Sequence, residues 1–218
     1  MNKQRKVEQF IEEKLAHGAT QKAFDEIARY LLCSCELMVG EKPYRLTEIE
    51  FYCHEINKTS CWRDGDKGPH AEPEIIYAFR YHKTAAKKFQ AEMGHFYLHG
   101  SGIDFTFGNP TVRWGGILLR GIAQMFDEQT EIEGPWNVRK EVLGALKEQG
   151  KEIEKKILDG NIYLVPSSAR NHPLFQGPRW NIWDKRKLLR YTTTLNRANP
   201  KNNGLLPCPS ANVNKDLK

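Results

Sequence analysis

The segment RLTEIEFY (residues 45–52) places two carboxylates, Glu48 and Glu50, inside a stretch that otherwise has the composition of a β-strand. Side chains alternate between the two faces of a strand, so one face here is mostly apolar and the other is acidic. The apolar face carries Thr47, Ile49 and Phe51, and the acidic face carries Leu46, Glu48, Glu50 and Tyr52. The acidic face must meet water, a groove or a partner charge, and a carboxylate in a groove can take a proton from a water molecule.

A second charge, Arg120, interrupts the apolar strand candidate GGILLRGI (115–122). Burying a charge without a partner is costly, so Glu50 and Arg120 should each pair, form hydrogen bonds or line a cavity. Residue pattern alone favours a structural salt bridge over a functional site. Both interpretations predict that these two charges find partners inside the fold.

Composition sets the class of protein. The 218 residues are 39% hydrophobic and 28% charged, which is ordinary for a globular chain. A net charge of +6 favours a polyanionic partner. No apolar run reaches the length of a membrane span, and the start MNKQRKVEQF has no hydrophobic signal core. We therefore expect a cytoplasmic protein that does not bind membranes.

Cysteine and glycine spacing gives no sign of a metal or nucleotide cofactor. The five cysteines include no CxxC pair, and no GxGxxG or P-loop pattern occurs. An irregular set could be drawn as a metal site on paper, but buried thiols and solvated imidazoles are the more common outcome; its members are Cys53, His54, Cys61 and His70. For His82, His95 and His99 we expect exposed or core-satisfied imidazoles. We expect no metal and no cofactor.

Hydrophobic periodicity supplies the elements that would position Glu50 and Arg120. It predicts helices at 5–17, ending at Gly18, and from a Thr20 cap onward, then strands at 34–40 and 44–53 around a Glu41-Lys42-Pro43 turn. A long polar loop is expected at 57–74, followed by strands at 94–99, 102–107 and 115–122 and helices at 136–148 and 151–158. These elements predict a single α+β domain over residues 1–197. Residues 198–218 form an Asn- and Pro-rich tail that we expect to be poorly ordered.

The order of several segments resembles the alkyladenine (3-methyladenine) DNA glycosylase family, of which the chain would be a divergent member. The similar segments span about residues 20–200: AFDEIARYLLCSCEL (23–37), TEIEFY (47–52), YAFR (77–80), GHFYLH (94–99), GGILLRGI (115–122), IEGPWN (132–137), GPRWNI (177–182) and LLRYTTTLN (188–196). The resemblance implies a curved antiparallel β-sheet flanked by helices. It also implies a base excision repair hydrolase that flips alkylated purines such as 3-methyladenine out of DNA.

Residue roles follow from the same resemblance. Glu50 matches the glutamate that activates the attacking water, and Arg120 matches an arginine that holds the water and the sugar-phosphate. Tyr52 matches a tyrosine that stacks on the base, and Tyr77 stands where the family has a base-binding histidine. Ser101, in the shortened segment HGSGI, stands near the family's wedge tyrosine, and Gly108, with Asn109 adjacent, stands at its pocket asparagine. The family needs no metal or redox cofactor.

DNA contacts are expected at Ser101 and Gly102, and at Lys83, Lys87 and Lys88 in the basic run KTAAKK. A second basic run, DKRKLLR (184–190), could also meet phosphates. Most basic runs, however, are simply solvated faces of a protein. DNA binding should be weak to moderate and salt-sensitive, and the chain should be a monomer. The tryptophans at 114, 136, 180 and 183 are expected to pack in the core or over its edge rather than against bases. The alternative function is a non-catalytic nucleic-acid-binding or scaffold protein with the same fold; an unrelated hydrolase is less favoured, because no Ser-His-Asp or Cys-His constellation is visible.

Overall fold

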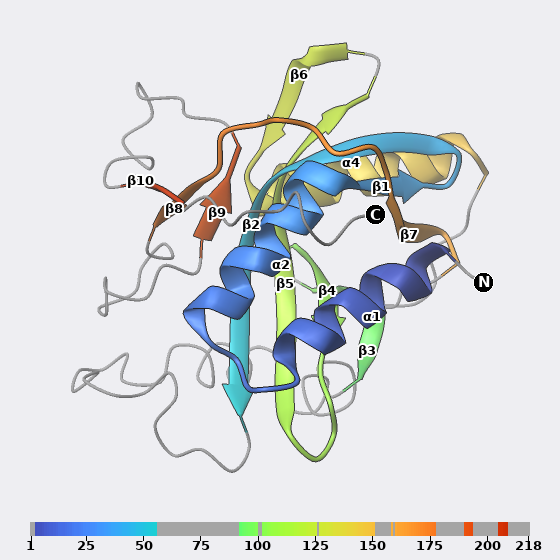
Figure 1. The fold of residues 1–218 in the computed structure, drawn as a ribbon. Coiled ribbons are helices and arrows are strands. Elements are labelled where there is room, and N and C mark those ends of the chain that lie inside the picture. The colour runs from blue at the N-terminus through green and yellow to red at the C-terminus, as the bar shows by residue number, and fades with distance from the viewer. Residues whose placement is uncertain are drawn as a thin grey trace, which may run out of the picture.

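A computed structural model describes eight parts of the chain: residues 3–55, 92–99, 102–125, 127–150, 158, 160–177, 190–193 and 205–208. In these parts the protein is α+β, with helices packed on a sheet in which every strand pairing is antiparallel. Figure 1 shows α1 and α2 crossing the front of the sheet and α4 behind the β1–β2 hairpin. The predicted α+β class and antiparallel sheet are confirmed.

The first two helices are those that the periodicity predicts. Helix α1 (Lys3–Leu15) is followed by Gly18, whose φ of 103° suits a glycine. Helix α2 (Gln21–Ser34) begins at Thr20, whose hydroxyl accepts a hydrogen bond from the amide of Ala23 at 3.2 Å. The predicted cap is therefore confirmed, and it satisfies one of the amides that a helix start leaves without an intrahelical partner.

Strands β1 (Cys35–Val39) and β2 (Lys42–Glu55) form the predicted hairpin, but the turn lies earlier than expected. The pairs Val39–Lys42 and Met38–Pro43 belong to the ladder, so the turn consists of Gly40 and Glu41. Gly40 has a φ of 58°, which glycine adopts without strain. The prediction of a turn at Glu41-Lys42-Pro43 was wrong because it relied on the proline and overlooked the glycine before it.

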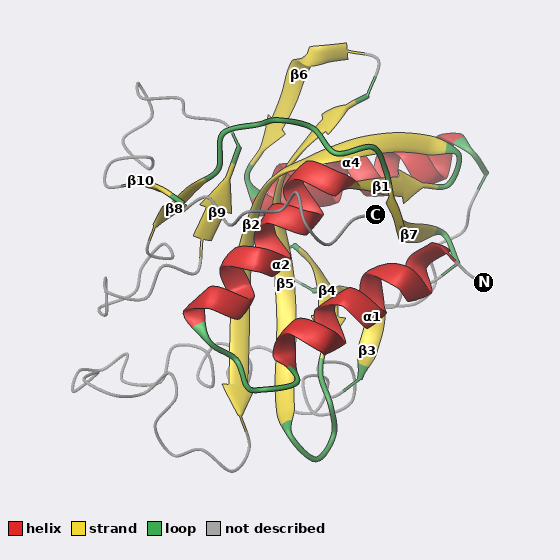
Figure 2. Ribbon diagram, in the orientation of Figure 1, coloured by secondary structure: helices red, strands yellow, loops and turns green. Residues whose placement is uncertain are grey.

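Strands β3 (Met93–Leu98), β4 (Ile103–Phe107) and β5 (Arg113–Gln124) and helix α4 (Pro135–Glu148) also match the predicted elements. Strands that the sequence did not predict are short or polar: β6 (Asp127–Glu133), β7 (Ile162–Pro166), β8 (Phe175–Gly177), β9 (Arg190–Thr192) and β10 (Leu206–Pro207). The main order is β10-β8-β9-β2-β5-β4-β3; outside this order, β1 pairs with β2, β7 pairs with β1, and β6 pairs with β5 (Figure 2).

Several predictions concern segments that the structure does not describe. The loop expected at 57–74 lies outside the described residues, as does nearly all of the helix expected at 151–158. Within the segment predicted as a tail, residues 205–208 are described: β10 pairs with β8, and Cys208 is buried. No helix in the described part of the chain is long and apolar enough to cross a membrane.

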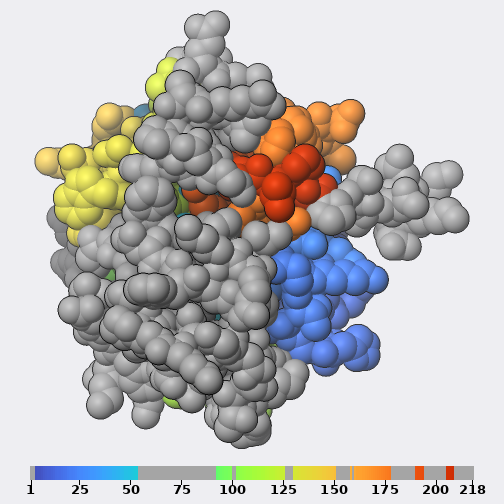
Figure 3. Space-filling view, turned by 90° about the vertical axis from the view of Figure 1, so that its left-hand side faces the viewer, coloured from blue at the N-terminus to red at the C-terminus, as the bar shows by residue number. Residues whose placement is uncertain are grey.

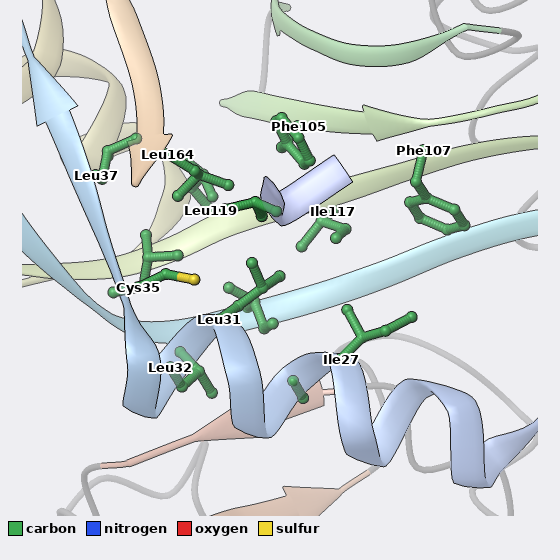
Figure 4. Close-up of a cluster of buried hydrophobic side chains, with 14 of the residues drawn as sticks. Ile27, Leu31, Leu32, Cys35, Leu37, Phe105, Phe107, Ile117, Leu119 and Leu164 are labelled. Carbon is green, nitrogen blue, oxygen red and sulfur yellow. The ribbon is translucent and has the colours of Figure 1, made fainter. Parts of the chain in front are cut away.

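The apolar core lies between α2 and one face of the sheet. Figure 4 shows Ile27 and Leu31 of α2 facing Ile117 and Leu119 of β5, with Phe105 and Phe107 of β4 beside them. All of these side chains are almost completely buried. This packing fixes which face of each central strand is available for other chemistry, since the side chains between the core residues must point away from α2.

Candidate active site

Core packing turns the acidic side chains of β2 away from α2. Ile49 and Phe51 belong to the core, and the Phe51 ring lies 4.6 Å from that of Phe24 in α2. Glu50 and Tyr52 alternate with these residues and so lie on the opposite face, which we call the polar face. The predicted apolar and acidic faces are correct for residues 49–52.

Leu46 is buried, although it was assigned to the acidic face. The register of β2 against β5 shifts between Leu46 and Glu48 and again before Ile49, which marks a β-bulge. Leu46 stands opposite Ile122, which alternates with Leu118 and Arg120 along β5, so the assignment of Leu46 to the face of Glu48 and Glu50 is consistent with the pairing. Tyr44 donates a hydrogen bond from its hydroxyl to Glu141 of α4 at 2.8 Å. This end of the face is therefore apolar and buried rather than acidic.

Three of the predicted site residues come together on the polar face. The Glu50 side chain is only 1% exposed, and its Oε1 lies 3.3 Å from Nη1 of Arg120 on the neighbouring strand. The hydroxyl of Tyr52 donates a hydrogen bond to Oε2 of Glu50 at 2.9 Å. Both carboxylate oxygens are therefore held in a fixed orientation. Tyr77, the fourth member of the predicted set, lies outside the described residues.

Glu48 and Arg190 complete this arrangement, and neither was assigned a role from the sequence. Oε1 of Glu48 accepts hydrogen bonds from Nε of Arg120 at 2.6 Å and from Nε of Arg190 at 2.7 Å. Arg190 stands directly opposite Glu50 in the β2–β9 pairing. Glu48, Glu50, Arg120 and Arg190 form what we call the charge cluster, in which two carboxylates balance two guanidinium groups.

The charge cluster favours ionised side chains. Burial acts to raise the pKa of Glu48, but the hydrogen bond from Arg190 and the charges of both arginines outweigh it, so the pKa lies below its ordinary value. Burial acts to lower the pKa of Arg120, and the charges of Glu50 and Glu48 outweigh it and raise the pKa. Arg120 and Glu48 therefore stay charged at neutral pH.

The lowered pKa of Glu48 predicts an acid-dependent contribution to stability. A carboxyl whose pKa is lower in the folded state stabilises the fold above its unfolded pKa, about 4.3, and loses this contribution as the pH falls through its folded pKa. We expect Glu48→Gln to reduce the free energy of unfolding at pH 7 and to differ less from the wild type in acid. Urea unfolding at pH 7, 4 and 3 measures this, with Thr20→Ala as a pH-independent control that costs about 1 kcal/mol. A constant difference at all three pH values would contradict the assignment.

A second buried pair lies in the same row of the polar face. Glu50 is opposite Leu118, Leu118 is opposite Asp104, and Asp104 is opposite Tyr97, so these side chains point to one side of the sheet. Two strand spacings separate Glu50 from Asp104, about 10 Å between the backbones. Oδ1 of Asp104 lies 3.1 Å from Nε2 of His99, and both side chains are at most 6% exposed.

The His99–Asp104 pair was not assigned a functional role from the sequence, although His99 was expected to be exposed or satisfied in the core, and the second outcome is confirmed. One sequence feature could have predicted a buried polar pair here: Asp104 is an acidic residue inside the apolar strand IDFTF. Burial and the charge of Asp104 both raise the pKa of Tyr97. The pair adds hydrogen-bonding groups to the face that holds Glu50.

Gly116 lies between two polar side chains of the next row. It is opposite Tyr52 on one side and Thr106 on the other, and it adds no side chain of its own to the polar face. A glycine in the interior of a strand often marks a place where a ligand or another segment approaches the backbone. Gly116 itself is buried, so the side chains nearest Tyr52 and Thr106 on this face come from other positions.

The remaining residues that were predicted to contact DNA or the base do not gather beside Glu50 in the described part of the chain. Gly102 is buried, and a Cβ there would lie 2.9 Å from Leu118 and 3.0 Å from Pro135, so its backbone is packed closely between them. Asn109 lies in the β4–β5 turn, where its side chain accepts hydrogen bonds from Thr111, and not in the row of Glu50. The DNA contacts predicted at Lys83, Lys87, Lys88 and Ser101 fall outside the described residues.

Metal binding has no support in the described parts of the chain, where no three histidine, cysteine, aspartate or glutamate side chains gather as metal ligands would. Cys53 is buried in the core, on the face opposite the charge cluster. Burial raises the pKa of the Cys208 thiol to about 11, so this cysteine stays protonated at neutral pH. The expectation of a buried thiol is confirmed for Cys53, while Cys61 lies outside the described residues; Cys33, Cys35 and Cys208 are also free and buried.

Comparison with known proteins leaves the family open. No family model matches the chain. The chain is 25% identical over 184 residues to Uncharacterized protein L759 of Acanthamoeba polyphaga mimivirus, and the alignment covers 74% of this chain and 79% of that protein. The similarity extends over most of both chains and carries no functional description, so function has to be argued from the site.

Proposed function

We propose that this protein is a DNA glycosylase that hydrolyses the N-glycosidic bond of alkylated purines such as 3-methyladenine. The observation that carries the proposal is the Glu50 carboxylate, 1% exposed on the polar face and oriented by Arg120 at 3.3 Å and the Tyr52 hydroxyl at 2.9 Å. The antiparallel α+β architecture is consistent with the family that the sequence resembles. A target base would have to leave the DNA stack to reach this face.

In the proposed reaction the bond between the sugar C1′ and the purine nitrogen breaks, and its electron pair leaves with the base. Positive charge then develops on the sugar, and the Glu50 carboxylate stabilises it. A water oxygen bonds to C1′ while Glu50 takes the water proton, which leaves an abasic sugar and a free base. A cationic base such as 3-methyladenine departs as a neutral molecule and needs no proton from the protein.

The charge cluster would serve this chemistry by holding the Glu50 carboxylate in place. Arg120 bridges Glu50 and Glu48, and Arg190 binds the same Glu48 oxygen from the other side. Such a network orients the base before substrate arrives, so little reorganisation is needed during the reaction. The His99–Asp104 pair, in the same row, would offer hydrogen-bonding groups to the edge of a flipped base.

A non-catalytic nucleic-acid-binding or scaffold protein is the second candidate, and one observation favours it. Both oxygens of Glu50 already have partners, and the charge cluster balances two negative with two positive groups, as a structural network would. A structural network needs no substrate, and the absence of base release from every alkylated duplex would support it.

Substrate preference provides the direct test. We expect release of 3-methyladenine from duplex DNA with little release of hypoxanthine, because the cationic lesion has a weaker glycosidic bond and costs less to extrude. Ser101 and Tyr77, which replace the family's wedge and base-binding histidine, supply less help with a neutral lesion. The measurement is single-turnover release from matched duplexes carrying 3-methyladenine, 7-methylguanine, hypoxanthine or ethenoadenine. Efficient hypoxanthine excision would show that the substrate assignment is wrong.

A further inference from the structure

Trp136 is exposed at the start of α4, although a tryptophan at this position was expected to pack in the core or over its edge. It is 50% exposed, and among the described residues the other exposed large hydrophobic side chains are Val112 at 41% and Leu206 at 54%. A tryptophan gains more from burial than almost any other side chain, so a half-exposed indole ring is a candidate contact for a partner.

Two cations accompany the exposed ring. The guanidinium of Arg139 lies 5.0 Å from the Trp136 ring centroid, and the Lys140 ammonium lies 5.6 Å from it. The first turn of α4 contains no acidic residue. Stacking within one helix explains the positions of the two cations, but it leaves half of the tryptophan in water. An aromatic face beside positive charge suits a partner that offers both flat rings and negative charge.

The start of α4 is tied to the polar face by three contacts. The amide of Gly134, the residue before α4, donates to the carbonyl of Arg120 at 2.7 Å. Nη1 of Arg139 donates to the carbonyl of His99 at 2.9 Å, and Pro135 packs against Gly102. The yellow atoms at the left of Figure 3 belong to the chain around the start of α4 and lie on the molecular surface.

We propose that Trp136, Arg139 and Lys140 form a nucleic-acid contact in which Trp136 stacks on an unpaired base and the two cations meet phosphates of the same DNA strand. The contact lies beside His99 and Gly102, since Arg139 binds the His99 carbonyl and Pro135 packs against Gly102. In the sequence these two residues flank Ser101, which stands in place of the wedge tyrosine implied by the resemblance. An indole on α4 would supply the stacking surface that this serine lacks. The inference rests on the proposed function for its choice of DNA as the partner.

Binding of unmodified DNA tests the contact without requiring any chemistry. Fluorescence anisotropy with a labelled single-stranded oligonucleotide and with a labelled duplex should show that Trp136→Ala weakens single-strand binding at least about fivefold. Trp136→Phe should restore most of the affinity, because the stacking face is kept. Lys140→Ala should reduce the slope of log affinity against log salt by about 0.7 for the single strand, while Trp136→Ala should leave that slope unchanged.

Two control variants test whether the loss of any exposed apolar side chain or any exposed positive charge would weaken DNA binding equally. Val112→Ala truncates a side chain that is 41% exposed in the β4–β5 turn, and Lys22→Ala removes a charge that is 87% exposed on α2. Both should bind DNA as the wild type does. Arg139 is left unchanged, since its hydrogen bond to the His99 carbonyl would confuse binding with folding.

Two results would overturn the proposed contact: equal effects of Trp136→Ala and Val112→Ala, or a wild type that binds neither oligonucleotide at low salt. The second result would indicate a protein partner for this surface instead. Failure of the glycosylase proposal is distinguishable, because a chain that binds through Trp136 but releases no base from any alkylated duplex keeps the contact and loses only the activity.

Discussion

Replacement of Glu50 by glutamine is expected to lower 3-methyladenine release by at least about 100-fold, the lower end of what a positioned general base contributes. Glutamine keeps the size of the side chain, and its carbonyl oxygen can still accept a hydrogen bond from Arg120 or Tyr52. It cannot take a proton from water or offset positive charge on the sugar. The measurement is single-turnover release from a duplex containing 3-methyladenine, with enzyme in excess.

Affinity for the same duplex should stay within about twofold of the wild type, because the change removes a base and not a phosphate contact. Glu36→Gln is the matched control: Oε1 of Glu36 lies 2.7 Å from Nη2 of Arg170, so the variant also removes a carboxylate that pairs with an arginine. Glu36 lies on β1, outside the charge cluster, and its variant should retain full activity. Release that survives Glu50→Gln, or that is lost equally in Glu36→Gln, would show that the base has been assigned to the wrong residue.

Replacement of Arg120 by methionine is expected to cost about 3–5 kcal/mol of unfolding free energy at pH 7, the usual penalty for removing one partner of a buried ion pair. Arg120 is 13% exposed and contacts Glu48 and Glu50, so its loss leaves excess negative charge on a buried face. The penalty should shrink in acid, because protonation of the remaining carboxylates removes that charge. Urea unfolding at pH 7 and pH 4 measures both effects.

Arg170→Met is the comparison for Arg120→Met, since Arg170 pairs with Glu36 at 2.7 Å but both side chains are about one-fifth exposed. A pair in contact with solvent contributes about 1 kcal/mol or less. The double variant Arg120→Met/Glu50→Gln should recover part of the loss, because it removes a carboxylate together with its cation. Equal costs for the two arginine variants would mean that the charge cluster is not the tightly coupled network that its distances indicate.

Glu50→Gln and Arg120→Met together distinguish a functional role of the charge cluster from a purely structural one. A purely structural network predicts a stability loss for Arg120→Met and no base release for the wild type to lose. A glycosylase predicts the same stability loss, together with release that depends on Glu50. The contact proposed at Trp136 is tested separately from both outcomes, because its binding assay uses unmodified DNA.

Local sequence determined much of this fold and part of the candidate site. Apolar periodicity and the Thr20 cap define the first two helices, and alternation places Glu50 and Tyr52 on one face of a strand. An arginine in an apolar strand signals a buried partner, which the structure identifies as Glu48 and Glu50. These features depend on neighbours a few residues apart, so the sequence carries them directly.

The remaining features depend on contacts between segments that are far apart in the chain, which hydrophobic periodicity does not predict. Pairing of β2 with β9 brings Arg190 to Glu48, although the two residues are 142 positions apart in the chain. A strand of three residues, such as β9, is too short for its hydrophobic alternation to be recognised in the sequence. The bulge beside Glu48 depends on the register with β5, which alternation within one strand does not predict. The exposure of Trp136 likewise depends on how α4 packs, because an indole at a helix start has the same sequence signature whether it is covered or open to solvent.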